Sequence, residues 1–302
     1  MSSFRFVAAA AGAAFGLLAA AGHAQVPPDI AAKIKAAGPK IDFSVMQLYA
    51  PLQPKEPYAG VTVTRDLAYG PDPLQKVDVL QPIAASAPRP VMLFVHGGGF
   101  TRGDKRQTDN MLVWAVNHGM VGVDLDYRLA PKDPWPAGAQ DLASALAWTK
   151  AHIASYGGDP NHVILWGHSA GANHVADYVA HPELHGPEFS GVRGAIVMSA
   201  FYPQTLAAPN PYYGTDPSLQ TLDASIARMV RVPIPLYVVN AEYDPDGFRI
   251  YGDALDRALT AANRPHGRIL LKDHDHLSEG LAVGTSDVSL TTPLLAWIRT
   301  VQ

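Results

Sequence analysis

The chain has 302 residues, of which 48% are hydrophobic and 17% are charged, and it contains no cysteine. The lack of cysteine excludes disulfides, cysteine-ligated metal sites and a thiol nucleophile, so any nucleophile must be an oxygen or a lysine. A net charge of −4 excludes the basic field that nucleic acid or anionic lipid would require.

Residues 1–24 have the three parts of a secretory signal: a polar start, an apolar run from Val7 to Gly22 and a small-residue ending, with cleavage expected after Ala24. The 16-residue run would span about 24 Å as a helix, short of the ~30 Å hydrocarbon core. A cleaved signal is therefore favoured over a membrane anchor. We expect an exported protein, periplasmic or secreted, without stable membrane insertion.

Residues 25–60 are rich in Pro and Ala and contain one short helical stretch, Asp29–Ala37, which ends at Gly38-Pro39. This composition is typical of an arm or cap. The catalytic domain is expected to follow over residues 61–302.

Short β-branched runs then alternate with helical patterns. Strands are predicted at Val61–Leu67, Lys76–Leu80, Val91–His96, Met120–Asp124, Val163–Trp166, Ala195–Met198, Leu236–Asn240 and Arg268–Leu271. Helices are predicted at Thr108–Asn117, Ala137–Tyr156, Ala170–His181, Gly247–Ala262 and Leu290–Val301. The early runs leave no room for helices between them, so we expect an α/β fold whose sheet begins antiparallel and becomes mostly parallel, with helices on both faces.

Residues 200–232 interrupt this alternation with several prolines and the pair Tyr212-Tyr213. The stretch is too long for an ordinary connection, and long loops in compact domains are commonly lids or binding elements. We predict a lid insert here.

Gly167-His168-Ser169-Ala170-Gly171 directly follows the strand-like Val163–Trp166 and directly precedes a helical pattern. A serine on such a strand-to-helix turn adopts strained dihedrals that flanking glycines permit, and its hydroxyl projects above the sheet. The context predicts that Ser169 is a nucleophile.

His96-Gly97-Gly98-Gly99-Phe100 follows another strand-like run. Acyl transfer needs backbone N–H donors for the developing oxyanion, and successive glycines leave such donors unobstructed. We predict an oxyanion hole from the amides of Gly98, Gly99 and Ala170. The alternative of a phosphate loop is disfavoured because no Gly-Lys-Ser/Thr follows.

A nucleophilic serine needs a base and an orienting acid. Asp244 follows the strand-like Leu236–Asn240, and Glu242 and Asp246 are its rivals. His276 and the rival His274 follow the last predicted strand. The chain order Ser, Asp, His is that of α/β-hydrolases. A metal site on the His-x-His pair is the weaker interpretation, because two ligands lack a third and the serine motif stays unexplained.

In these motifs, the sequence resembles the α/β-hydrolases of the hormone-sensitive-lipase-like and related carboxylesterase families over roughly residues 60–300. His96–Phe100 resembles their HGGGF motif, Asp126–Pro131 (DYRLAP) their second signature, and Gly167–Gly171 their nucleophile motif. His168, Ala172 and the stretch His276-Leu277-Ser278 are more similar to the esterase and formamidase branch that includes bacterial feruloyl-esterase-like proteins.

The resemblance implies an α/β-hydrolase fold with a small cap, with Ser169 as nucleophile, His276 as base, Asp244 as acid, and Gly98, Gly99 and Ala170 as oxyanion donors. It implies two-step hydrolysis of a small-molecule carboxylic ester, with neither a cofactor nor a metal. The alternatives are an arylformamidase or amidase on the same triad, and a non-catalytic binding module.

Aromatic side chains near the expected active edge favour short-chain or aromatic esters. The residues in question are Phe100, Tyr127, Trp166, Tyr202, Tyr212 and Tyr213.

Overall fold

The structure is a computed structural model that describes residues 25–84, 87–201, 210–214, 219 and 221–301. The expected secretory signal at 1–24 and Tyr202 therefore lie outside the described residues, as does much of the expected lid insert.

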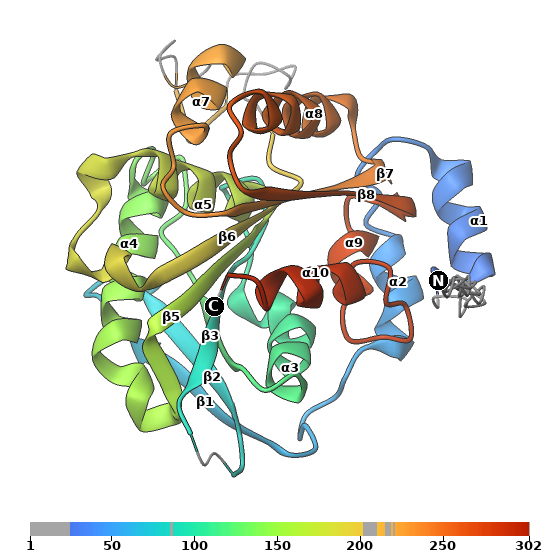
Figure 1. The fold of residues 1–302 in the computed structure, drawn as a ribbon. Coiled ribbons are helices and arrows are strands. Elements are labelled where there is room, and N and C mark those ends of the chain that lie inside the picture. Colours follow the sequence, from blue (N-terminus) through green and yellow to red (C-terminus); the bar gives the residue numbers. More distant parts are fainter. Residues whose placement is uncertain (1–24, 85–86, 202–209, 215–218, 220, 302) are drawn as a thin grey trace, which may run out of the picture.

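An eight-stranded sheet forms the centre of the molecule, with the order β1-β2-β4-β3-β5-β6-β7-β8 (Figure 1). Its strands are β1 (Val61–Ala68), β2 (Lys76–Pro82), β3 (Arg89–Val95), β4 (Val121–Leu125), β5 (Gly158–His168), β6 (Val192–Met198), β7 (Leu236–Tyr243) and β8 (His266–Asp275). The pairs β1/β2 and β2/β4 are antiparallel, whereas all other neighbours are parallel. The predicted change from antiparallel to parallel is confirmed.

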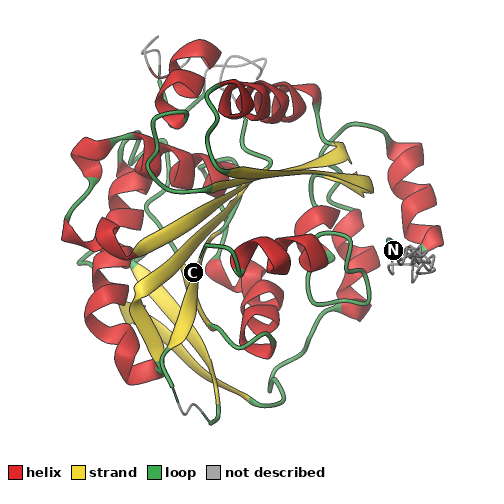
Figure 2. Ribbon diagram, in the orientation of Figure 1, coloured by secondary structure: helices red, strands yellow, loops and turns green. Residues whose placement is uncertain are grey.

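Helices cover both faces of this sheet, as Figure 2 shows. The α-helices are α1 (Pro28–Ala37), α2 (Val45–Tyr49), α3 (Asp109–Asn117), α4 (Ala137–His152), α5 (Ala170–Ala180), α7 (Leu222–Met229), α8 (Asp246–Ala261), α9 (Ser278–Leu281) and α10 (Thr291–Ile298). Short 3-10 turns lie at Ala50–Leu52, Lys105–Thr108, Ile153–Tyr156, Pro182–Leu184 and Pro187–Gly191. Helices α4, α5 and α8 pack on one face, and α3 and α10 on the other.

The continuous apolar runs of the strands follow from this double coverage. In β3, Val91, Leu93 and Val95 enter the core beneath α4 and α5, whereas Met92 and Phe94 enter the core beneath α3 and α10. All five side chains are at most 1% exposed. Because successive side chains of a strand point to opposite faces, a strand buried on both faces is apolar at every position.

The N-terminal arm packs beside the end of the last strand (Figure 1). Ile30 and Ile34 of α1 and Tyr49 of α2 form a small buried cluster with Ala282, which directly follows α9. The arm therefore rests on the segment that follows β8.

The insert at 200–232 contains a helix, α7, that the sequence analysis did not predict. Its partly buried Leu222 and Ile226 and the buried Met229 pack against the core on the α5 and α8 side. The short helices α2 and α9 were also not predicted.

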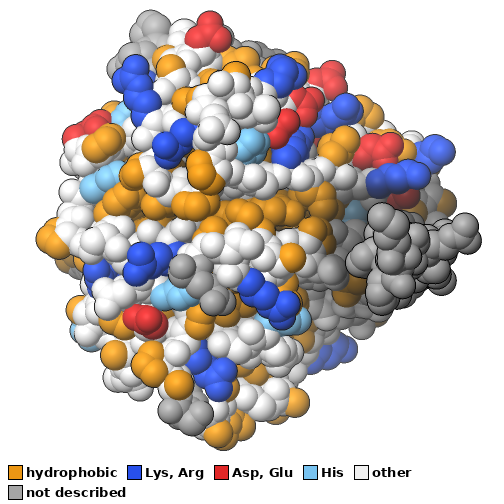
Figure 3. All heavy atoms as spheres, in the orientation of Figure 1, with side chains coloured by type: hydrophobic (Ala, Val, Ile, Leu, Met, Phe, Trp, Pro, Cys, Tyr) orange, Lys and Arg blue, Asp and Glu red, His pale blue; other side chains and the backbone are white. Residues whose placement is uncertain are grey.

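The face drawn in Figure 3 carries interspersed basic and acidic side chains, and a band of hydrophobic side chains crosses its middle. This mixture agrees with the small net charge of −4. Among the described residues, no helix combines the length and apolar composition that crossing a membrane requires.

Candidate active site

Ser169 lies on the sharp turn between β5 and α5, with φ +55° and ψ −123°. The neighbouring glycines make this turn possible. A Cβ on Gly167 would lie 2.2 Å from the carbonyl oxygen of Gly171, and a Cβ on Gly171 would lie 2.0 Å from that of Val95. Both distances are far below van der Waals contact, so the turn excludes any side chain at either position. Ser169 itself is 8% exposed.

His276 and Asp244 complete a chain of hydrogen bonds with Ser169. His276 Nε2 lies 2.9 Å from Ser169 Oγ, and His276 Nδ1 lies 2.8 Å from Asp244 Oδ1. The three residues follow β5, β7 and β8, whose carboxyl ends meet at one edge of the parallel part of the sheet. The geometry is that of a nucleophile, a base and an orienting acid.

Asp244 is fully buried, yet its surroundings favour the charged form. Burial acts to raise its pKa, but the hydrogen bond and charge interaction with His276, followed by hydrogen bonds from Ser199 and Ala241, outweigh burial and lower the pKa. Ser199 Oγ donates to Asp244 Oδ2 over 2.5 Å, and the Ala241 amide donates to the same oxygen over 3.0 Å. Asp244 is thus held in its ionised form beside His276.

The rival acids and base are directed elsewhere. His274 Nε2 lies 3.1 Å from Asp287 Oδ2, and its two ring nitrogens each lie 3.2 Å from a serine hydroxyl. Glu242 accepts a hydrogen bond from the Asp273 amide over 2.8 Å, and Asp246 begins α8. Of the candidates, the structure brings only Asp244 and His276 to Ser169.

The glycine loop lies against the serine turn. A Cβ on Gly97 would lie 3.0 Å from Ser169 Cβ, and a Cβ on Gly98 would lie 1.8 Å from the carbonyl oxygen of Arg102. Gly98 and Gly99 have φ +129° and +61°. Within the described part of the chain, neither amide donates to a protein acceptor. Beside the amide of Ala170, they are available as oxyanion donors.

Tyr127 supports this loop and does not line an open site. It is 1% exposed, its ring stacks on that of His96 at 4.4 Å, and its hydroxyl donates to the His96 carbonyl oxygen over 2.9 Å. The structure therefore corrects the expectation that Tyr127 contacts substrate.

Trp166 is also a core residue. It packs against Phe94 at 5.0 Å and Trp114 at 5.9 Å, in the layer beneath α3 and α10. Leu165 enters the opposite layer, so the alternation of the strand directs the indole into the core beneath α3 and α10. Only position along the strand suggested a substrate role, and the side-chain direction corrects it.

Phe100, Tyr212 and Tyr213 come together beside Ala170 in one buried cluster. Phe100 stacks on Tyr212 at 4.7 Å with an interplanar angle of 4°, and meets Tyr213 edge-on at 5.5 Å. Tyr213 donates a 2.7 Å hydrogen bond to Asp177 of α5, which fixes this part of the insert.

Two further aromatic residues of this cluster were missed by the sequence analysis. The ring centroid of Phe201 lies 5.6 Å from that of Phe100. The ring centroid of Phe248 lies 5.0 Å from that of Phe201 and 4.4 Å from that of His276. Both follow the carboxyl end of a strand, as Asp244 and His276 do. That position was the signal that could have found them.

His168, His276 and Glu279 place potential ligand atoms within 4.8 Å of one another. Both ring nitrogens of His276 are already engaged, by Ser169 and Asp244. The trio therefore offers no free set of three metal ligands. The two histidines of the His-x-His pair face different carboxylates, Asp287 for His274 and Asp244 for His276.

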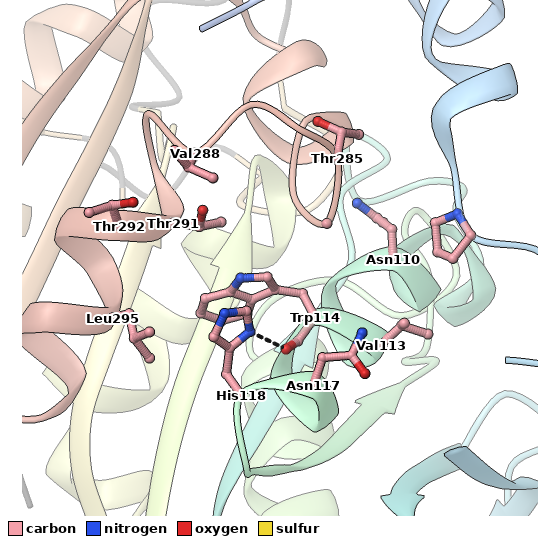
Figure 4. Close-up of a pocket in the computed structure, with 12 residues that line it drawn as sticks. Asn110, Val113, Trp114, Asn117, His118, Thr285, Val288, Thr291, Thr292 and Leu295 are labelled. Atoms are coloured by element: carbon pink, nitrogen blue, oxygen red, sulfur yellow. Dashed lines mark hydrogen bonds between the residues drawn. The ribbon is translucent and has the colours of Figure 1, made fainter. Parts of the chain in front are cut away.

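A separate cavity of about 290 Å³ lies between α3 and α10 (Figure 4). Trp114, His118, Val288 and Thr291 are among its lining residues, and none of the lining residues belongs to the serine turn, the glycine loop or the residues that face them. It is remote from the proposed chemistry.

The family model BD-FAE matches residues 77–184. Esterase LipQ of Mycobacterium tuberculosis is 30% identical over 230 residues, which cover 68% of this chain and 53% of LipQ. Esterase LipC of the same organism is 36% identical over 111 residues, covering 36% of this chain and 28% of LipC. The chain thus matches about a quarter to a half of the length of these relatives.

Solved structures agree on the fold. Esterase B of Lactobacillus rhamnosis superimposes with a TM-score of 0.71 at 18% identity, covering 90% of this chain and 96% of that one. A bacterial heroin esterase gives 0.70 at 23% identity, covering 90% of this chain and 97% of that one. The sheet order and these similarities show an α/β-hydrolase fold, and the matched regions are similar to those of esterases.

Proposed function

We propose that this protein is a serine carboxylesterase in which Ser169 is the nucleophile, His276 the base and Asp244 the acid. One observation carries the proposal: Ser169, His276 and Asp244 are joined by hydrogen bonds of 2.9 and 2.8 Å beside a loop of glycine amides. The esterase relatives support the same reaction class.

In the proposed reaction, Ser169 Oγ attacks the ester carbonyl carbon while His276 Nε2 takes the hydroxyl proton. The amides of Gly98, Gly99 and Ala170 hold the resulting oxyanion. The intermediate collapses, the C–O bond to the alcohol breaks, and the imidazolium returns its proton to the alcohol. His276 then takes a proton from water, the hydroxide attacks the acyl-enzyme, and the acid leaves as Ser169 regains its proton.

We infer that the substrate is a short-chain or aromatic ester. The supporting observation is the buried aromatic cluster that includes Ala170, in which the ring centroid of Phe248 lies 4.4 Å from that of His276. Planar apolar groups pack well on such rings. Turnover should fall steadily from p-nitrophenyl acetate to the palmitate ester, and a steady rise along that series would contradict this inference.

The nucleophile is tested by Ser169→Ala with p-nitrophenyl acetate as substrate. We expect turnover to be abolished, since no other hydroxyl contacts His276 Nε2 among the described residues. Ser144→Ala, at an exposed position of α4, is the matched control and should keep wild-type activity. A fluorophosphonate probe should label the control and not Ser169→Ala. Near-normal turnover by Ser169→Ala would overturn the proposal.

Esterase and amidase activities are separated by comparing matched phenyl acetate and acetanilide substrates on the wild-type protein. The proposal expects preference for the ester, and faster turnover of the amide would favour an arylformamidase or amidase.

We also propose that the protein is exported after removal of residues 1–24. N-terminal sequencing of the protein from the periplasm of an expression host should begin at Gln25. Recovery of the chain only in the cytosol with Met1 retained would contradict export.

A further inference from the structure

His168, the residue before Ser169, contacts the loop that carries His276. Its Nε2 lies 2.8 Å from the main-chain carbonyl oxygen of His276. A carbonyl oxygen can only accept, so His168 Nε2 must carry a hydrogen and donate it. The bond joins the end of β5 to the segment after β8 without using any atom of the three reacting side chains.

The His168 ring is neutral in this position. Burial, together with the nearby His276, lowers the pKa of His168 to about 3. The two rings lie 4.9 Å apart. A charged His168 would oppose the imidazolium that forms on His276 during catalysis, and the neutral ring does not.

Glu279 lies close to the same nitrogen. It is fully buried, and its Oε1 lies 3.3 Å from His168 Nε2. Burial, with Asp244 nearby, raises the pKa of Glu279 well above its ordinary value. Neither carboxyl oxygen has a hydrogen-bond partner of good geometry among the described residues. His168 and Ser199 are thus polar groups close to this carboxyl.

The turn around His276 has its own internal bonds, which fix its shape and not its distance from Ser169. Ser278 donates its amide to Asp275 Oδ1 over 2.8 Å, and the Asp275 amide donates to Ser278 Oγ over 2.8 Å. The contact from His168 is different, because it ties this turn to the strand that carries the nucleophile.

We propose that His168 is a positioning residue for the base: its Nε2–H holds the main chain of His276 at a fixed distance from the serine turn, and Glu279 confines the ring to that orientation. The inference rests on the proposed esterase function. The 2.9 Å bond between Ser169 and His276 breaks and re-forms during turnover, so a second, permanent link keeps the base in place.

The test compares His168→Leu, which removes the donor, with His168→Gln, whose side-chain amide can place a donor near the same point. With p-nitrophenyl acetate, we expect His168→Leu to lower kcat about 10- to 100-fold with KM nearly unchanged. His168→Gln should recover most of that loss. A merely structural role would not give this recovery together with an unchanged KM.

Wild-type kcat equal to that of folded His168→Leu would overturn the inference, as would a His168→Gln variant as slow as His168→Leu. If His168→Leu does not fold, as judged by circular dichroism, the inference is tested by comparing Glu279→Gln with Glu279→Leu. Glu279→Gln, a neutral mimic of the protonated acid, should keep kcat within about threefold at pH 7, whereas Glu279→Leu should lower it; equal rates would overturn the inference.

Failure of the esterase proposal is distinct from these outcomes. It would appear as a wild-type protein without turnover of any ester, or as an active Ser169→Ala. The positioning inference fails instead when the wild type is active, Ser169→Ala is inactive and the His168→Leu or Glu279→Leu variant keeps the wild-type kcat.

Discussion

Asp244 accepts several hydrogen bonds in addition to the one from His276. Besides His276 Nδ1, its carboxylate accepts from Ser199 Oγ, Asn240 Nδ2 and the Ala241 amide. These donors fix the orientation of the carboxylate and stabilise its charge in a buried place. The acid can therefore set the tautomer of His276 and stabilise its imidazolium form.

Asp244→Asn should lower kcat by about 10²–10⁴-fold, because an amide cannot stabilise the imidazolium and favours the wrong tautomer of His276. Stopped-flow or steady-state hydrolysis of p-nitrophenyl acetate measures the loss. Asp246→Asn, two residues along, is the matched control and should stay within about twofold of the wild type. Equal losses in both variants would argue against Asp244 as the acid.

A second prediction compares alanine substitutions at the adjacent Gly98 and Gly99. An alanine at Gly98 would place its Cβ 1.8 Å from the Arg102 carbonyl oxygen, whereas a Cβ at Gly99 would have no atom of the described residues within 4 Å. Both positions have positive φ, so both variants are strained, but only Gly98→Ala must displace the loop. We expect kcat to fall at least tenfold further in Gly98→Ala than in Gly99→Ala. A larger loss in Gly99→Ala would contradict the loop geometry.

The sequence predicted those site residues whose chemistry depends on local context. Ser169 needs a strand, a turn and flanking glycines, all of which are contiguous in the chain. Phe201, Phe248 and the contact of His168 with His276 depend on how separate strands end beside one another. Trp166 lies close to Ser169 along the chain, yet its side chain enters the core beneath α3 and α10. Proximity in sequence alone therefore did not predict a place in the site.

At the scale of elements, all eight predicted strands exist, since a run of apolar residues buried on both faces has few alternatives. Their ends were less predictable. β5 begins at Gly158, before its apolar part, and β8 extends past Leu271 to Asp275, which pairs with Tyr243 of β7. Helices α2 and α9 have 5 and 4 residues, too few turns for a clear helical period, and α7 lies in the proline-containing insert.

The arm gives a prediction at this scale. Ile34 of α1 is fully buried in the cluster with Tyr49 and Ala282, so Ile34→Ala should leave a cavity and lower the free energy of unfolding by about 2–4 kcal/mol. Chemical denaturation followed by circular dichroism measures the change. Ile83→Ala, at a position 72% exposed, should change stability by less than about 0.5 kcal/mol. A neutral Ile34→Ala would indicate that the arm does not contribute to folding stability.

At the scale of the whole molecule, a buried acid, Asp124, makes the folding stability depend on pH. Asp124 of β4 is 1% exposed, and its Oδ1 has no hydrogen-bond partner among the described residues. Burial, with Asp78 and Asp109 close by, raises the pKa of Asp124 well above the ordinary 3.8. The folded state therefore keeps a proton that the unfolded state releases above about pH 4.

A raised folded-state pKa lowers stability as pH increases from the unfolded value toward the folded value. Asp124→Asn removes this proton, so its melting temperature relative to the wild type should rise between pH 5 and pH 8. Calorimetry at several pH values measures the difference, and Asp223→Asn, at an exposed position of α7, should show no such trend. A flat difference for Asp124→Asn would contradict the raised pKa.

The order of the sheet places the nucleophile and the base in regions of different local stability. β5, which precedes Ser169, lies between β3 and β6, whereas β8, which precedes His276, is an edge strand and pairs with β7 alone among the described strands. Outer strands open more readily than central ones, and amide hydrogen exchange reports that difference. Under mildly denaturing conditions we expect β8 to detach before the central strands and to carry the base away while the centre stays folded. Such a molecule would be reversibly inactive and would keep most of its helical circular dichroism.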